Sequence, residues 1–219
     1  ERLPESGASV PSPRAGAAMG YDPVRETVVL FGGRGRTAAG RVDLGDTWEW
    51  DGDRWTQIES TDSPPAQSYM DLVYGPAGGR LVLYGASGQT DVWSFDGENW
   101  TVLGEPDGPT PTGASSLVTF DVGRGLLVAH VRTYGTYVWD GMDWSEDIAI
   151  SPSNDCTALT YDVASARLMI ACADLFRSLE ISVSGPSGWE LSSVANPPGV
   201  WVPYGVELLR DATGRTLMV

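Results

Sequence analysis

Short runs of apolar and branched residues recur along the chain, each bounded by turn-forming residues. Examples are Val28–Phe31, Leu81–Tyr84, Leu126–Val128 and Leu168–Ile170. Runs of this length between turns are typical of β-strands, whereas a helix shows an apolar position every three or four residues over a longer window. The pattern therefore predicts an all-β protein.

One tryptophan closes each unit of a repeat. The closing residues lie 45, 44 and 45 residues apart, and they are Trp55, Trp100, Trp144 and Trp189. Within each unit two apolar strands precede a third and a fourth strand. In the first three units the third strand carries aromatic residues, and an Asp-Gly pair leads into the fourth strand. Asp-Gly favours a two-residue hairpin turn because glycine accepts the positive φ that the turn requires. Four strands at this period are typical of one β-propeller blade.

We therefore expect an all-β fold of the β-propeller class, built from four-stranded antiparallel blades. The approximate repeats cover residues 13–58, 65–103, 111–146 and 154–191, with a partial fifth repeat at 202–219. Both ends of the repeat pattern fall inside a blade, so we expect a fragment of a six- or seven-bladed ring or an open partial ring. The alternative is a five-bladed ring that closes between residues 1–3 and 216–219.

Several residues of the first repeat follow the order of a Kelch repeat. They are Pro13-Arg14, Met19, Tyr21-Asp22, Arg25, Phe31-Gly32-Gly33, Asp46-Thr47-Trp48 and Trp55. The chain therefore resembles the Kelch family, and especially the propeller domain of galactose oxidase-like bacterial proteins. The likeness covers nearly the whole chain but weakens in the later repeats, where Ala171-Cys172 replaces the diglycine of the fourth. It implies one propeller domain or fragment over residues 1–219, from a secreted or surface-exposed bacterial protein.

The charge of the chain excludes some partners. Its 14 basic residues, all arginine, and 29 acidic residues give a formal net charge of −15. A surface this acidic repels nucleic acids and anionic membranes. No apolar stretch approaches the roughly 18 residues that a membrane-spanning helix needs. We expect neither a nucleic-acid partner nor membrane insertion.

The two cysteines lie in the fourth repeat, one on each of its first two strands. If Tyr161 pairs with Arg167 across the turn, counting back along both strands places Cys156 opposite Cys172. Residues in that position have Cα atoms about 4.5–5.5 Å apart, a distance that a disulfide can span. The spacing predicts a cross-strand disulfide and an extracytoplasmic location, with two buried free thiols as the alternative.

The chain lacks the residues of a metal or redox centre. Galactose oxidase-like enzymes hold copper through two histidines, two tyrosines and a Tyr-Cys crosslink, but this chain has one histidine, His130. Its place at the end of a second strand favours a structural role. A single histidine also gives too few ligands for a zinc site of cysteines and histidines. No nucleophile-elbow motif accompanies it that would indicate a catalytic serine. We therefore predict no cofactor, no metal and no catalytic residue. Paired carboxylates in the central funnel of a carbohydrate-active enzyme remain the alternative.

Three repeated features are assigned to structure rather than to ligand binding. The Asp-Gly turns supply too few oxygens for calcium and are explained as turns. The arginine after each first hairpin is expected to form exposed ion pairs with the nearby aspartate, worth roughly 0–1 kcal/mol each. The closing tryptophans are expected in the core or between blades.

The link from Arg34 to Gly45 is the longest expected loop within a blade, and it carries Arg34, Arg36 and Arg41. The same face of the propeller is expected to hold the further candidate residues Arg132, Tyr134 and Trp201. Arginines with aromatic residues on an acidic protein suit a carboxylate, a glycan or a protein segment. The alternative is a solvated variable loop.

The sequence thus predicts a non-catalytic, extracellular binding or structural module that presents these residues to a protein or carbohydrate ligand. A third possibility is that neighbouring subunits complete the sheet by strand addition.

Overall fold

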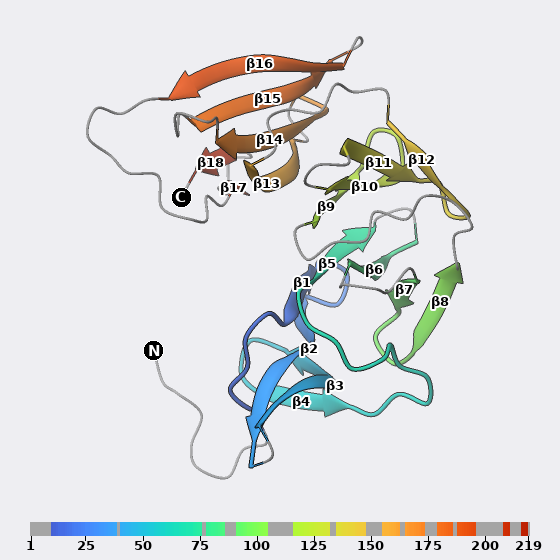
Figure 1. Cartoon of the computed structure of the whole chain (residues 1–219). Helices are drawn as coiled ribbons and strands as arrows, with labels where there is room; N and C mark the ends of the chain where they lie inside the picture. Colours follow the sequence, from blue (N-terminus) through green and yellow to red (C-terminus); the bar gives the residue numbers. More distant parts are fainter. Residues whose placement is uncertain are drawn as a thin grey trace. The chain divides into compact units, whose positions relative to one another are not determined.

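The computed structural model contains strands joined by turns. It describes residues 10–38, 40–75, 78–85, 91–104, 116–131, 135–147, 155–162, 165–173, 179–185, 188–195, 208–210 and 216–218. Two compact units, residues 1–105 and 106–219, are described here one at a time (Figure 1). Within the described ranges there is no helix of any kind, and hence none that could cross a membrane. The prediction of an all-β protein is confirmed.

The first unit contains two four-stranded antiparallel sheets. The strands of the first sheet, in spatial order, are β1 (Ala18–Asp22), β2 (Thr27–Thr37), β3 (Gly40–Trp50) and β4 (Trp55–Ile58). The second sheet consists of β5 (Met70–Gly75), β6 (Arg80–Gly85), β7 (Val92–Phe95) and β8 (Trp100–Gly104). Each strand pairs with its neighbour in the sequence, as the four-strand repeat predicts.

The second unit contains two more such sheets and a two-stranded one. The first comprises β9 (Ser116–Asp121), β10 (Leu126–Val131), β11 (Gly135–Trp139) and β12 (Trp144–Glu146). The next comprises β13 (Asp155–Asp162), β14 (Arg167–Ala173), β15 (Leu179–Gly185) and β16 (Gly188–Ala195). The two-stranded sheet pairs β17 (Leu208–Arg210) with β18 (Thr216–Met218). The prediction of four-stranded antiparallel sheets is confirmed.

The core of the first unit lies between its two sheets. Strand β1 alternates buried Ala18 and Gly20 with exposed Met19 and Tyr21, so only one face of the sheet meets the neighbouring sheet. The buried side chains between the sheets are Ala18, Val29, Phe31, Met70, Leu72, Leu81, Leu83, Phe95 and Trp100. The closing tryptophan of the second repeat therefore belongs to the core.

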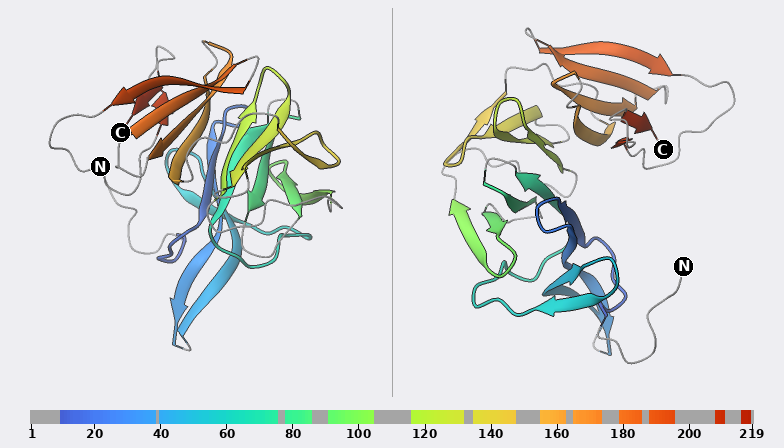
Figure 2. Two further views of the ribbon diagram at one scale, coloured as in Figure 1. Left: turned by 45° about the horizontal axis from the view of Figure 1, so that its top comes forward. Right: turned by 180° about the vertical axis from the view of Figure 1, so that it is seen from behind.

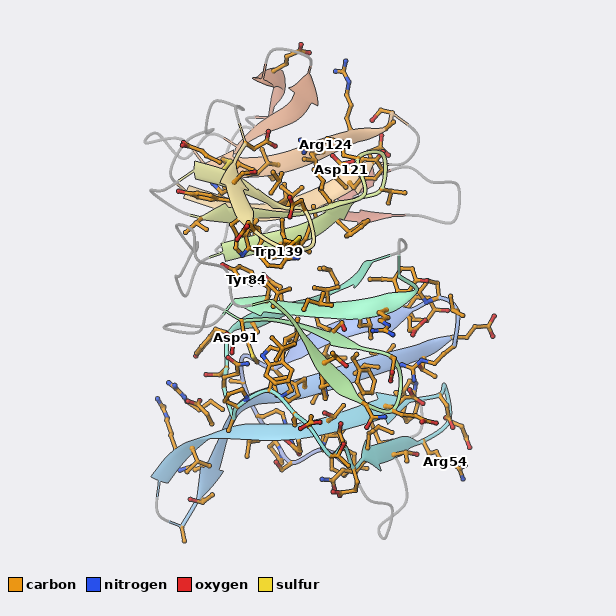
Figure 3. All side chains as sticks on the ribbon, turned by 90° about the vertical axis from the view of Figure 1, so that its right-hand side faces the viewer. Arg54, Tyr84, Asp91, Asp121, Arg124 and Trp139 are labelled. Atoms are coloured by element: carbon orange, nitrogen blue, oxygen red, sulfur yellow. A yellow bond between two sulfur atoms is a disulfide. The ribbon has the colours of Figure 1, made fainter. Side chains whose placement is uncertain are left out.

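The arginine that follows a first hairpin is less exposed than the sequence predicts. Arg25 Nε lies 2.9 Å from Asp22 Oδ2, and its Nη1 lies 2.6 Å from Glu49 Oε2 on β3. The Asp22 carboxylate is only 2% exposed, so the expectation of a weak surface pair is wrong here. Arg124 repeats the arrangement in the second unit with a largely buried Asp121 (Figure 3). Arg167 forms an exposed ion pair, as expected, and the observed partner is Glu190 of β16.

Each Asp-Gly connection has four residues between the strand ends, and a main-chain hydrogen bond from its first residue to its fourth, such as Asp51 N–H to the Arg54 carbonyl at 3.3 Å, leaves two central residues in the turn. The strand pairs that close them are Trp50 with Trp55, Phe95 with Trp100 and Trp139 with Trp144. In the first connection the Asp51 carboxylate accepts the main-chain N–H groups of Asp53 and Arg54 at 2.9 Å each. Asp96 and Asp140 do the same in theirs. The side-chain acceptor stabilises the turn, which supports the turn assignment over calcium binding.

The disulfide between Cys156 and Cys172 is present, with an S–S distance of 2.06 Å. The register next to the hairpin differs by one residue from the predicted one, because Tyr161 pairs with Leu168 and not with Arg167. A bulge between Cys156 and Ala158 shifts the ladder back, so that Cys156 still faces Cys172. The two Cα atoms lie 3.7 Å apart.

His130 is a buried structural residue of β10, as the sequence favours. Its ring is 1% exposed, and Nδ1 lies 3.1 Å from Thr136 Oγ1 on the paired strand β11. Within the described part of the chain, no group of three metal-ligating side chains surrounds it or lies elsewhere. Burial lowers the pKa of His130 to about 4 because the charged ring cannot be solvated.

This histidine should make the fold sensitive to mild acid. In the unfolded chain its pKa is about 6.5, so the unfolded state binds more protons as the pH falls from about 6.5 to 4. We expect the free energy of unfolding to fall by about 3 kcal/mol over that range. Urea unfolding at pH 7, 5.5 and 4 measures this loss. His130→Gln, which does not titrate, should show a much flatter profile, and an equally steep one would contradict the assignment.

Candidate functional site

The predicted loop between Arg34 and Gly45 is a β-ribbon. Strands β2 and β3 continue past the rest of their sheet, pairing Arg34 with Asp43, Gly35 with Val42 and Arg36 with Arg41. The ribbon projects beyond β1 and β4 in each view (Figures 1 and 2). The loop expectation is therefore wrong, because strand pairing resumes after the diglycine instead of ending there.

A bulge at the diglycine allows the strands to continue. The ladder shifts between Phe31 and Gly33, and Gly33 has a φ of 97°, a conformation that favours glycine. Its N–H donates to the carbonyl of Gln67 at 2.8 Å, so the main chain of the bulge stays paired. The Phe31-Gly32-Gly33 segment thus joins the core of the sheet to the ribbon.

Side chains alternate between the two faces of the ribbon, and one face carries most of the charge. Arg34 and Arg36 share this face with their cross-strand partners Asp43 and Arg41. Arg34 Nε lies 2.9 Å from Asp43 Oδ1, and Ser68 Oγ donates to the same oxygen at 2.9 Å. The hydrogen bonds from Arg34 and Ser68 hold the pKa of Asp43 below its usual range. The charge of Arg34 is therefore neutralised.

The other two arginines have no such counter-charge. Arg36 and Arg41 lie directly opposite each other, and both side chains are exposed. Neither makes an ion pair or side-chain hydrogen bond to any other residue that the structure describes. Like charges directly opposite in an antiparallel pair destabilise it. The pair therefore leaves two positive charges open on a strongly acidic protein.

Tyr69 presents an aromatic ring beside Arg34. The side chain is 53% exposed, although the residue has a φ of 64°, which is unusual for a bulky residue. Its N–H donates to the Gly16 carbonyl at 2.7 Å, and a Cβ at Gly16 would lie 2.9 Å from the ring. The ring centroid lies 5.9 Å from Arg34 Cζ. The ring is thus held in place and open to solvent.

Arg14 closes the inner side of the site. Its guanidinium makes two hydrogen bonds to the Asp46 carboxylate and one, at 3.0 Å, to the carbonyl of Gly32. Burial alone raises the pKa of Asp46, but hydrogen bonds from Arg14 and Trp48 outweigh it and lower that pKa. Arg14 is therefore a neutralised, structural part of the wall.

These residues surround one hollow of about 360 Å³. Its walls are formed by Pro13, Arg14, Ala15, Arg34, Gly35, Arg36, Arg41 and Tyr69. We call it the arginine hollow. Two of its four arginines are paired with carboxylates and two are unpaired among the described residues, so the hollow is suited to an anion.

The structure brings together part of the predicted site and adds to it. Arg34, Arg36 and Arg41 share the arginine hollow, as the sequence predicts for one surface. Arg132, Tyr134 and Trp201 lie outside the described residues. Sequence reasoning missed Arg14 and Tyr69. Arg14 belongs to the Kelch-like pattern but lies in no cluster of charges in the sequence. No feature of the sequence indicates that Tyr69 belongs to the site.

Comparison with known protein families and with curated proteins finds no match. Comparison with solved structures finds β-propellers. A chain of the mitotic checkpoint complex is 13% identical with a TM-score of 0.50, over 87% of this chain and 54% of that one. AofleA from Arthrobotrys oligospora is 14% identical with a TM-score of 0.53, over 92% and 64%. A mutant of AofleA with three arginines replaced by alanine is 15% identical with a TM-score of 0.52, over 93% of this chain and 64% of that one.

The likeness to these structures establishes the fold class. The four-stranded antiparallel sheets of this chain are β-propeller blades, as the repeat predicts. The chain spans between about half and two thirds of the length of these three chains.

Proposed function

We propose that this chain is a non-catalytic binding module of Kelch type that takes an anionic part of a protein or glycan ligand into the arginine hollow. One observation carries the proposal. Arg36 and Arg41 face each other without a counter-charge beside the exposed, fixed ring of Tyr69. A folded protein accepts such repulsion and backbone strain where the arrangement serves a ligand.

The charges of the described carboxyl groups favour binding over acid catalysis. The groups with a shifted pKa are Asp22, Asp43, Asp46, Asp51, Asp96 and Asp140, and each pKa is lowered. Burial acts in the opposite direction at Asp22 and Asp46, but hydrogen bonds to the ionised form outweigh it. A glycosidase-type general acid needs a raised pKa instead.

An extracellular location fits the disulfide between Cys156 and Cys172, because such bonds persist in oxidising compartments. The net charge of −15 keeps anionic macromolecules away from most of the surface. An anionic ligand would then be directed to the arginine hollow, where local positive charge prevails.

Binding of anionic polymers to the immobilised chain tests the proposal. The probes are polygalacturonate, dextran sulfate and poly-L-glutamate, with uncharged dextran as the reference. We expect at least one anionic probe to bind, and Arg36→Gln/Arg41→Gln to weaken it at least about ten-fold by removing both charge-assisted contacts.

Arg54→Gln is the matched control. Arg54 lies in the same unit, in an Asp-Gly connection outside the hollow, and its side chain is 75% exposed (Figure 3). Its loss should leave binding unchanged. Circular dichroism checks that each variant is folded, which is expected because all three arginines are exposed. The proposal fails if no anionic probe binds, or if the double variant binds as tightly as the unaltered chain.

A further inference from the structure

We infer that the arginine hollow binds one residue of an acidic oligosaccharide, with its carboxylate or sulfate between Arg36 and Arg41 and its ring against Tyr69. This inference rests on the proposed function and specifies its ligand. It follows from three features of the hollow. They are the facing positive charges of Arg36 and Arg41, the placement of the Tyr69 ring, and the hydrogen bonds that the surrounding main chain already makes.

The anionic group is placed by the cross-strand pair. Arg36 and Arg41 are directly opposite in the ladder, and Cβ atoms in such a pair are about 4.5–5.5 Å apart. Two guanidinium groups that start so close can converge on one anion. Their planar forks match both a carboxylate and a sulfate. Binding would also remove the repulsion between them.

The ring of the sugar is placed by Tyr69. An aromatic face carries partial negative charge, and the C–H groups on the apolar face of a pyranose carry partial positive charge. Tyr69 is 53% exposed, with Gly16 packed against its ring and Arg34 Cζ over the ring at 5.9 Å from the centroid. These contacts fix the ring before any ligand arrives, and the sugar would use its exposed part. A preorganised ring loses little entropy on binding.

The main chain around the hollow favours a compact ligand over an extended peptide. Arg34 and Ala15 exchange two main-chain hydrogen bonds of 2.7 and 3.0 Å. On the neighbouring strand, the carbonyl of Leu44 accepts from the N–H of Gln67 at 3.1 Å. A peptide that adds as a strand needs a run of free main-chain groups, and at Arg34 and Leu44 these groups are occupied. Recognition at these two positions therefore falls to side chains, within a volume near the lower limit of ligand sites.

Calorimetric titration of the full chain separates the possible ligands. The probes are trigalacturonic acid, its neutral methyl ester, a sulfated heparin tetrasaccharide and hexaglutamate. We expect one of the two acidic saccharides to bind at least about ten-fold more tightly than both the methyl ester and hexaglutamate. Binding of trigalacturonic acid identifies a carboxylate as the anionic group. The heparin tetrasaccharide carries carboxylates as well as sulfates, so it identifies sulfate when it binds and trigalacturonic acid does not.

The variant Tyr69→Ala adds a second criterion. It should weaken the acidic saccharide about ten-fold or more and leave any weak binding of hexaglutamate unchanged, because only the sugar uses the ring. Tyr69→Phe keeps the ring and should bind as the unaltered chain does. The discrimination between probes by the unaltered chain holds as a test even if Tyr69→Ala fails to fold.

The outcomes distinguish this inference from the proposed function. Equal or tighter binding of hexaglutamate overturns the saccharide assignment and leaves an anion-binding module. Equal binding of the methyl ester overturns the role given to Arg36 and Arg41. Binding of none of the four probes overturns the inference, whereas the proposed function is decided by the polymer panel.

Discussion

Replacing Trp100 with alanine is expected to lower the free energy of unfolding by about 3–5 kcal/mol, the usual cost of removing a buried tryptophan. The side chain is 2% exposed and lies between the two sheets of the first unit. Its ring packs against Phe31 and Phe95 at centroid distances of 5.1 and 4.8 Å. Its indole N–H donates at 2.9 Å to Thr47 Oγ1, and this hydroxyl is itself buried. The substitution removes the packing and leaves a buried hydroxyl without its donor.

Urea unfolding followed by far-ultraviolet circular dichroism measures this loss. Trp100→Phe keeps an aromatic ring but not the N–H donor, so it should cost clearly less. Trp50→Ala is the control, since Trp50 is half-buried and lies on the opposite face of its sheet. A cost at Trp100 no larger than that at Trp50 is incompatible with its place in the core.

Replacing Arg25 with alanine is expected to cost about 3–5 kcal/mol, the typical effect of breaking a buried ion pair from one side. The change leaves the buried carboxylate of Asp22 and the half-buried one of Glu49 without their cation. It also removes a contact to the second sheet, because Arg25 Cζ lies 5.4 Å from the centroid of the Phe95 ring. Arg25 therefore joins the first hairpin to β3 and to the neighbouring sheet.

The pH dependence of the cost provides a further check. Burial raises the pKa of Asp22, but the hydrogen bonds from Arg25 and Val24 outweigh it and hold that pKa below 3.8. The stabilisation is thus present above about pH 4 and is lost as the pH falls through the lowered value. Arg54→Ala, which breaks an exposed pair, should cost at most about 1 kcal/mol. Equal costs for the two variants would contradict the structural role of Arg25.

The fold could be predicted from the sequence because its signal is repeated. The turns and the runs of branched residues recur in each repeat, so one irregular repeat does not obscure the four-strand pattern. Local irregularities could not be predicted. The bulge between Cys156 and Ala158 adds one residue to a strand, and no glycine in the sequence indicates it. Because the bulge restores the pairing of Cys156 with Cys172, the disulfide is predicted correctly from a register that is wrong nearer the turn.

The candidate site could be predicted only in part from the sequence, because its residues come from different parts of the chain. Arg34, Arg36 and Arg41 are close in sequence and stand out as a cluster on an acidic protein. Tyr69 and Arg14 join them only through hydrogen bonds that connect segments distant in sequence, such as that from Tyr69 to Gly16. The ribbon is hard to predict from the sequence because glycines are typical of turns, although Gly35 sits within a regular ladder.

A crystal structure of the chain with the tightest-binding acidic oligosaccharide tests the central claim most directly. The arginine hollow should contain the ligand, with its carboxylate or sulfate oxygens within about 3.2 Å of guanidinium nitrogens of both Arg36 and Arg41. The sugar ring should lie against the face of Tyr69. A ligand bound elsewhere on the molecule, with the hollow occupied only by solvent, would contradict the account.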